Sequence, residues 1–256
     1  MQVTAWLAGR LGAAARALVP RAWHRSTRLA RQLLDKCDGR VLSGPFAGCR
    51  YVSGSHGSTY WPKLLGTYEC ELHGLIEEIL GRGFSRALIA GAAEGYYAAG
   101  LAIRSPRMEV VAWEASPAAR ELLGELLAKN GVGDRVRVRG ICTMSELACE
   151  LGNGEDAFLL VDIEGAEAIL IDPARLDGLN RAELLIETHE PFVPGVEALL
   201  TERFAATHHL RWIAPRPRRV EEIAPQQVAK RFHGALVQLM DERRPAGIRW
   251  LHLRPR

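Results

Sequence analysis

The chain has 256 residues, of which 48% are hydrophobic and 25% are charged, and its formal net charge is +3. This length and composition fit one or two domains with a packed core, and they exclude wholesale disorder, collagen-like repeats and a coiled coil. The basic excess is local, because six of the 33 basic residues precede the first acid, Asp35, and the remaining 27 stand against 30 acids. We therefore expect no nucleic-acid partner.

The cysteines argue for a reducing, cytoplasmic location. They are five in number and show no C-x-x-C spacing, which fits neither a disulfide framework nor a zinc site. No apolar run approaches the roughly 20 residues that a membrane-spanning helix needs. The first 19 residues also lack the basic and then apolar order of a signal peptide.

The N-terminal quarter of the sequence differs from the rest. Residues 5–35 read as one or two amphipathic helices, divided near Pro20, with arginines on one side. Such a helix either packs on the domain with a solvated arginine face or lies on an anionic membrane surface, and both alternatives stay open. A turn-rich stretch follows at 44–58. We expect residues 1–64 to form an N-terminal extension and residues 65–256 the main domain.

The main domain shows an alternation of helical and strand-like patterns. Apolar residues recur at helical spacing over 72–80, and short apolar runs then alternate with helical or loop segments. The predicted strands are 87–90, 110–113, 135–139, 157–161, 184–186, 209–213 and 248–253, and further helices are predicted at 118–130 and 227–242. This alternation indicates an α/β fold with a doubly wound, seven-stranded, mostly parallel sheet.

A glycine-containing turn follows the first of these strands. Residues 91–97 lead from its carboxyl end into a helix, which is where doubly wound sheets bind nucleotides, since the backbone must approach the ligand closely. Glu114 stands at the end of the next strand, where a carboxylate can accept hydrogen bonds from both hydroxyls of a ribose. Together the two features indicate a cofactor of the adenosine type.

The spacing of the glycines discriminates between such cofactors. A dinucleotide site expects G-x-G-x-x-G, but Ala93 and Tyr96 occupy the second and third glycine positions counted from Gly91. A tyrosine there is a poor match to NAD. S-adenosylmethionine has no phosphates and tolerates the looser turn.

Three motifs resemble those of FkbM-type S-adenosylmethionine-dependent methyltransferases. They are residues 91–97, 114–117 and 160–167, and the resemblance extends over about 65–215, with the segment 65–69 similar to a subset of the family. It implies a class I, Rossmann-like methyltransferase that methylates a hydroxyl of a sugar, glycan or secondary metabolite. Ile89 departs from the family, which has an acid there. The alternative function is therefore a catalytically inactive binding or scaffold protein, and a homodimer is an alternative to a monomer.

The site residues follow from these motifs. We expect the cofactor to contact Gly91, Ala92, Glu94, Gly95, Tyr97, Glu114, Ala115, Ile141 and Asp162. Asp162 ends the strand at 157–161, and Glu187 and His189 end the next one, so the three side chains should converge at the carboxyl edge of the sheet.

Methyl transfer needs the acceptor oxygen in line with the methyl group, and a base if the hydroxyl loses its proton. In our hypothesis His189 is that general base, oriented with the acceptor by Asp162 and Glu187. In the alternative, the same three residues bind a divalent metal ion that lowers the pKa of the hydroxyl. Glu164 and Glu167 either complement the N-terminal dipole of the following helix or contact the acceptor.

Overall fold

The computed structural model describes Leu29, Gln32 and residues 37–223 and 233–256. The helices predicted at 5–35 therefore lie almost entirely outside the described residues, as does the beginning of the helix predicted at 227–242. Within the part of the chain that is described, no helix is both long and apolar enough to cross a membrane.

A seven-stranded sheet forms the centre of the molecule, with the strand order β3-β2-β1-β4-β5-β7-β6. Every pairing among β1 to β5 is parallel, whereas β7 runs antiparallel to both of its neighbours. The strands are β1 (Arg86–Ala90), β2 (Glu109–Trp113), β3 (Val136–Arg139), β4 (Ala157–Val161), β5 (Glu183–Thr188), β6 (His208–Ile213) and β7 (Arg249–Pro255). The predicted fold class is confirmed, and all seven predicted strands are present.

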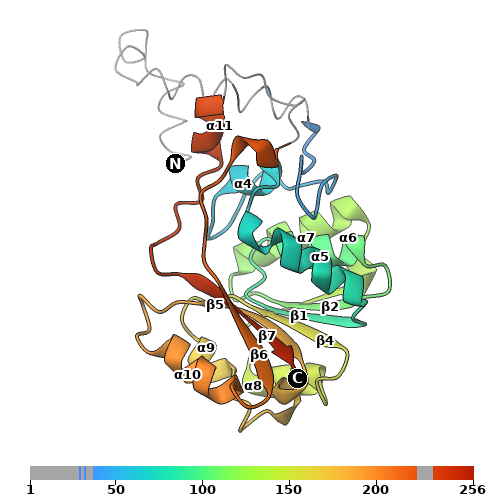
Figure 1. The fold of residues 1–256 in the computed structure, drawn as a ribbon. Coiled ribbons are helices and arrows are strands. Elements are labelled where there is room, and N and C mark those ends of the chain that lie inside the picture. Colours follow the sequence, from blue (N-terminus) through green and yellow to red (C-terminus); the bar gives the residue numbers. More distant parts are fainter. Residues whose placement is uncertain (1–28, 30–31, 33–36, 224–232) are drawn as a thin grey trace.

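Helices cover both faces of this sheet, as Figure 1 shows, with α5, α6 and α7 on one face and α8, α9 and α10 on the other. Their bounds are α5 (His73–Arg82), α6 (Tyr96–Arg104), α7 (Pro117–Asn130), α8 (Met144–Leu151), α9 (Glu167–Leu170) and α10 (Val196–Phe204). Two more helices, α4 (Tyr60–Leu65) and α11 (His233–Leu239), lie toward the top of the view, and Leu64 of α4 is buried in the core that α5 to α7 cover. Short 3-10 turns are η1 (Cys70–Leu72), η2 (Gly133–Arg135), η3 (Asp177–Asn180) and η4 (Val220–Glu222).

The central strands read as unbroken apolar runs because both of their faces are buried. Side chains alternate between two clusters: Ala87 and Ile89 of β1 join the cluster under α5 to α7, and Leu88 and Ala90 join the cluster under α8 to α10. The parallel pairing of β1, β2, β4 and β5 places their carboxyl ends along one edge of the sheet, where the predicted site residues lie.

Local sequence determines the bounds of α7. The Ser116 hydroxyl accepts a hydrogen bond from the Ala119 N–H, Pro117 occupies the first turn, and Gly131 ends the helix in the left-handed conformation with φ of 64°. A side-chain cap, a proline at the first position and a terminal glycine are the signals that begin and end helices. The prediction for this helix is therefore confirmed at both ends.

The helix predicted at 227–242 ends earlier than expected. Helix α11 stops at Leu239, whereas we predicted that it continues to Glu242. The Glu242 carboxylate instead accepts a hydrogen bond from the Glu69 N–H at 2.8 Å, so a tertiary contact draws the chain away from the helical path. A helical pattern of apolar residues cannot predict a contact with a residue so distant in the sequence.

The described part of the predicted N-terminal extension belongs to the main core. Val41, Phe46, Tyr51 and Val52 are buried in the same cluster as the side chains of β1. Within 37–58 the backbone forms turns and a single isolated bridge between Arg40 and Arg50. The core therefore shows no break at residue 64.

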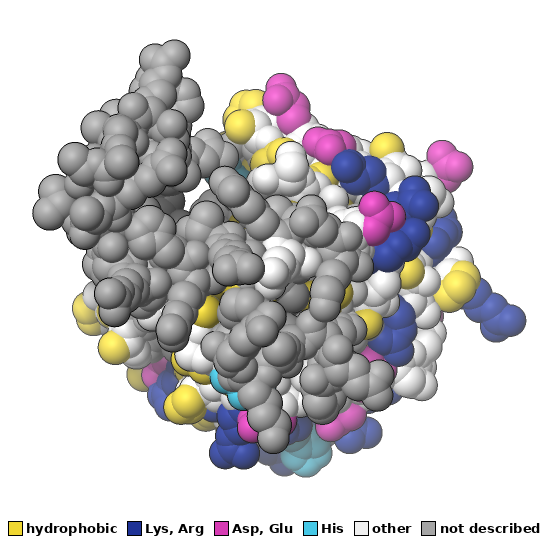
Figure 2. Space-filling view, turned by 90° about the horizontal axis from the view of Figure 1, so that it is seen from above, with side chains coloured by type: hydrophobic (Ala, Val, Ile, Leu, Met, Phe, Trp, Pro, Cys, Tyr) yellow, Lys and Arg dark blue, Asp and Glu magenta, His cyan; other side chains and the backbone are white. Residues whose placement is uncertain are grey.

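The surface carries charges of both signs. In the view of Figure 2, Lys and Arg side chains alternate with Asp and Glu along the described rim of the molecule. That part of the surface therefore presents no extended field of one sign.

Candidate active site

The glycine turn between β1 and α6 lies directly against the end of β4. Gly91 has a φ of 83°, and a Cβ there would stand 1.6 Å from the carbonyl oxygen of Asp162. Gly95 has a φ of 97°, and a Cβ there would stand 2.2 Å from Cδ1 of Leu123 in α7. Both positions therefore require glycine, because of their conformation and because of the close approach of neighbouring elements.

Glu114 holds this turn from the neighbouring strand. Its Oε2 accepts a hydrogen bond from the Ala93 N–H at 2.8 Å, and its Oε1 accepts one from the Ser116 N–H at 2.7 Å. Ala93 itself adopts a left-handed φ of 47°. A carboxylate has about four acceptor positions, so Glu114 is fixed in orientation and retains acceptor capacity for the hydroxyls of a ligand.

Two exposed apolar residues lie near Glu114: Ala115 follows it in the sequence, and Ile141 follows the neighbouring strand β3. Ala115 is exposed, and Ile141 has 68% of its surface exposed. An exposed isoleucine at the carboxyl edge of a parallel sheet is suited to cover the flat face of an adenine ring. Ala92 in the turn is largely buried, at 7% exposed.

Glu94 has partners that the sequence did not reveal. Its Oε1 accepts hydrogen bonds from the Lys63 ammonium and the Ser55 hydroxyl, both at 2.6 Å, and from the Tyr51 hydroxyl at 2.8 Å. Burial alone would raise the pKa of Glu94, but Lys63 and these hydrogen bonds hold it below its usual value. The side chain has no exposed surface, so Glu94 joins the 51–63 segment to the turn, and a direct cofactor contact would require these bonds to open.

Two other residues near the turn also point into the protein. Ile89, which stands where the family has an acid, is 1% exposed and packs in the core. The hydroxyl of Tyr97 donates a hydrogen bond to the Glu69 carboxylate. Neither side chain offers a free polar group to a ligand.

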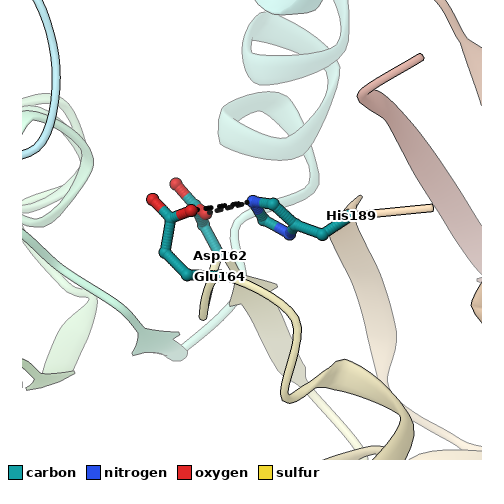
Figure 3. A group of neighbouring side chains, drawn as sticks. All are labelled: Asp162, Glu164 and His189. Atoms are coloured by element: carbon teal, nitrogen blue, oxygen red, sulfur yellow. Dashed lines mark ion pairs between the residues drawn. The ribbon is translucent and has the colours of Figure 1, made fainter. Parts of the chain in front are cut away.

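The predicted catalytic residues do converge at the ends of β4 and β5. Nε2 of His189 lies 3.8 Å from Oδ1 of Asp162 and 3.5 Å from Oε2 of Glu187. Glu164 approaches the same nitrogen at 3.3 Å, and Figure 3 shows the imidazole of His189 pointing toward both Asp162 and Glu164. Glu164 has a left-handed φ of 54°, which marks this loop as conformationally constrained.

Glu167 fixes the other side of the imidazole. Its Oε1 lies 2.8 Å from Nδ1 of His189 and accepts a hydrogen bond from the Gly165 N–H at 3.0 Å. The Glu167 side chain has no exposed surface. Glu167 was predicted to precede a helix, and it is the first residue of α9. Its main contact is with His189, and this contact sets the ring orientation so that Nε2 faces the carboxylates.

The surrounding acids change the protonation of the cluster. Burial of the imidazole lowers its pKa, but the hydrogen bonds that it donates to Glu164 and Glu167, together with the nearby carboxylate charges, outweigh burial and raise the pKa of His189 to about 10. Burial, together with the charge of Asp162, raises the pKa of Glu187, and burial also raises that of Asp162. The cluster therefore favours the protonated form of His189, and burial favours the protonated form of Glu187.

An arginine and glutamate network adjoins the cluster. The Arg244 guanidinium pairs with the carboxylates of both Glu69 and Glu187. Arg218 pairs with Glu71 and Glu242, each at 2.5 Å. Sequence reasoning missed these contacts. Glu69 lies in the 65–69 segment that carries part of the family resemblance, but Arg244 had no signal of its own.

Comparisons with known proteins assign no family to the chain. No protein-family model and no curated protein matches the chain. Among solved structures, an O-methyltransferase from Bacillus cereus in complex with SAH is similar at 16% identity and a TM-score of 0.44, over 78% of this chain and 87% of that one. The fibrillarin/Nop5p complex is similar at 15% identity and a TM-score of 0.47, over 85% and 92%. Similarities this low assign no activity, so the site itself must carry the functional argument.

Proposed function

We propose that the protein is an S-adenosylmethionine-dependent O-methyltransferase that acts on a hydroxyl of a sugar, glycan or secondary metabolite. The observation that carries this proposal is the position of Glu114. Its carboxylate is held by two backbone N–H groups beside the Gly91 turn, at the carboxyl ends of adjacent parallel strands. The acceptor class comes from the motif resemblance.

The described residues fit the parts of this cofactor. Glu114 would accept hydrogen bonds from the ribose hydroxyls, and Ile141 with Ala115 would cover the adenine. Gly91 lets the turn lie against the carbonyl of Asp162, so the turn and the end of β4 would together border the sulfonium end. When bound, S-adenosylmethionine supplies an electrophilic methyl group on a positively charged sulfur.

The acidic cluster supplies groups to position the acceptor and to take up its proton. A hydroxyl that approaches the end of β4 would meet Asp162, Glu164 and His189. The surrounding carboxylates raise the pKa of His189 to about 10, so its role as the base requires a lower pKa in the complex. A neighbouring cation produces such a shift, because positive charge disfavours the imidazolium. Glu167 keeps Nε2 directed toward the acceptor throughout.

A divalent metal ion is the second candidate for activating the hydroxyl. One atom each from Asp162, Glu164 and His189 lie within 4.8 Å of one another, and two carboxylates with an imidazole form a plausible donor set. The Glu167 contact with Nδ1 matches the carboxylates that orient metal-binding histidines. Glu164 takes the place that we predicted for Glu187, whose Oε1 is occupied by Arg244.

Calorimetric titration with S-adenosylmethionine tests the cofactor proposal. We expect Glu114→Gln to weaken binding by about 2 kcal/mol, or roughly 30-fold, since hydrogen bonds to charged groups contribute about 1.5–3 kcal/mol. Glu109→Gln is the matched control, because Glu109 begins the same strand and its side chain is exposed. If the wild-type protein bound no S-adenosylmethionine at millimolar concentration, the scaffold alternative would replace the enzyme.

Binding of Mn²⁺ tests the metal candidate without an acceptor. We expect electron paramagnetic resonance to detect bound Mn²⁺ in the wild-type protein and a marked loss in Glu164→Gln. Glu155→Gln, in the exposed loop before β4, is the control. If Mn²⁺ bound equally to all three proteins, or to none of them, the candidate metal site would be wrong.

A further inference from the structure

The segment before β7 reaches the candidate active site because of the sheet topology. Strand β7 pairs antiparallel with β5, so Arg249 at its beginning lies opposite Thr188 at the end of β5. The residues just before β7 therefore emerge at the carboxyl edge of the sheet. Arg244 is among them, and its side chain is 14% exposed.

Glu69 provides a fixed anchor for Arg244. Its backbone adopts a left-handed φ of 47°, which costs a non-glycine residue energy, and its N–H donates to Glu242 at 2.8 Å. One carboxylate oxygen accepts from the Tyr97 hydroxyl and the other from Arg244. With 1% exposure, this carboxylate is fully engaged inside the protein and faces no ligand.

Glu187 binds the other terminal nitrogen of the Arg244 guanidinium. Its Oε1 accepts from Nη1 of Arg244, and its Oε2 lies 3.5 Å from Nε2 of His189. The contact with Arg244 therefore determines which oxygen of Glu187 faces the imidazole. The chain of contacts runs from Glu69 through Arg244 and Glu187 to His189.

We propose that Arg244 is a positioning residue of the active site, which holds Glu187 against His189 from the anchor at Glu69. The inference rests on the proposed function, in which the cluster around His189 positions the acceptor and takes up its proton. A guanidinium suits this role, because its planar array of N–H groups can engage two carboxylates at once in fixed directions. The ammonium of a lysine is a point charge and cannot reproduce both contacts.

The histidine side-chain nitrogen spectrum tests this role. We would record it at one pH, in the presence of EDTA, and assign His189 through the His189→Gln variant. We expect Arg244→Gln to shift the Nε2 resonance of His189, and Arg244→Lys to shift it less in the same direction. Arg218→Gln should leave this resonance in place, although it removes an equal charge from the same network.

A protein that already carries Glu187→Gln shows whether Arg244 acts by positioning Glu187 or by a general effect on stability. If Arg244 acts through Glu187, Arg244→Lys should cause no further shift of the His189 resonance in that protein. A shift that persists there would overturn the proposal, as would equal shifts in Arg218→Gln and Arg244→Gln. Arg244→Lys keeps the charge, so it covers the case in which Arg244→Gln does not fold. Failure of S-adenosylmethionine to bind would instead contradict the proposed function and leave this test intact.

Discussion

The two halves of the candidate site are built differently. The cofactor half consists of a glycine turn and a carboxylate that binds backbone N–H groups, and its parts lie close together along the chain. The acceptor half consists of charged side chains from β4, β5 and the segments around Glu69 and Arg244. The first is a property of backbone conformation, and the second depends on long-range pairing of charges. The four predictions below test this contrast, from the largest expected effect to the smallest.

The buried pair of Lys63 and Glu94 is the exception in the cofactor half. Lys63→Met would leave a buried carboxylate without its cation, and we expect a loss of about 3–5 kcal/mol in the free energy of unfolding. Urea denaturation measures this loss. Lys129→Met is the control, because Lys129 forms an exposed pair with Glu125 and should change stability by less than about 0.5 kcal/mol. If both variants lost a similarly small free energy of unfolding, the pair of Lys63 and Glu94 would not be important for stability.

Gly91 is the point at which the two halves touch. Gly91→Ala would place a methyl group against the Asp162 carbonyl in a strained conformation, so we expect a loss of about 2–4 kcal/mol and weaker S-adenosylmethionine binding. Gly124→Ala is the control in thermal unfolding: no atom lies near its Cβ position in α7, and alanine should stabilise that helix by about 0.5–1 kcal/mol. Tolerance of Gly91→Ala would show that the halves are independent.

The charge on His189 should make the acceptor half sensitive to pH. Folding raises the pKa of His189 from 6.5 to about 10, so its protonation stabilises the folded state fully below pH 6.5. That stability is lost as the pH rises toward 10, by at most about 1.4 kcal/mol per pH unit. The difference in free energy of unfolding between wild type and His189→Gln, measured in EDTA, should shrink across this range. A constant difference would contradict a raised pKa.

The smallest expected effect concerns Ile141. Ile141→Ser should weaken S-adenosylmethionine binding by about 1 kcal/mol, or roughly fivefold, through lost apolar contact with the adenine. The side chain is largely exposed without a ligand, so stability should not change. Val138→Ser, on β3 and also partly exposed, serves as the calorimetric control. If both variants bound S-adenosylmethionine with equal affinity, Ile141 would not contact the adenine.

The same contrast explains what the sequence could predict. The strands were found because their buried faces leave apolar runs, and α7 was found because Ser116, Pro117 and Gly131 signal its ends locally. Glu114 followed from its place at a strand end. Each of these signals lies within a short stretch of sequence.

The contacts that escaped prediction join distant residues. Glu69 and Arg244 are 175 positions apart, and neither a periodic pattern nor a fixed spacing indicates that they meet. The same holds for Lys63 with Glu94, and for Glu242, which ends α11 early. Sequence reasoning brought Asp162, Glu187 and His189 to one edge of the sheet, but the orientation of their side chains depends on these long-range partners.

The place of β7 in the sheet has a consequence for folding. This strand follows all the others in the chain, yet it lies between β5 and β6. Among the described strands β6 pairs only with β7, so β6 can join the sheet only when β7 inserts between it and β5. Arg244 lies five residues before the first residue of β7, so the insertion of β7 also brings Arg244 to the acceptor half of the site.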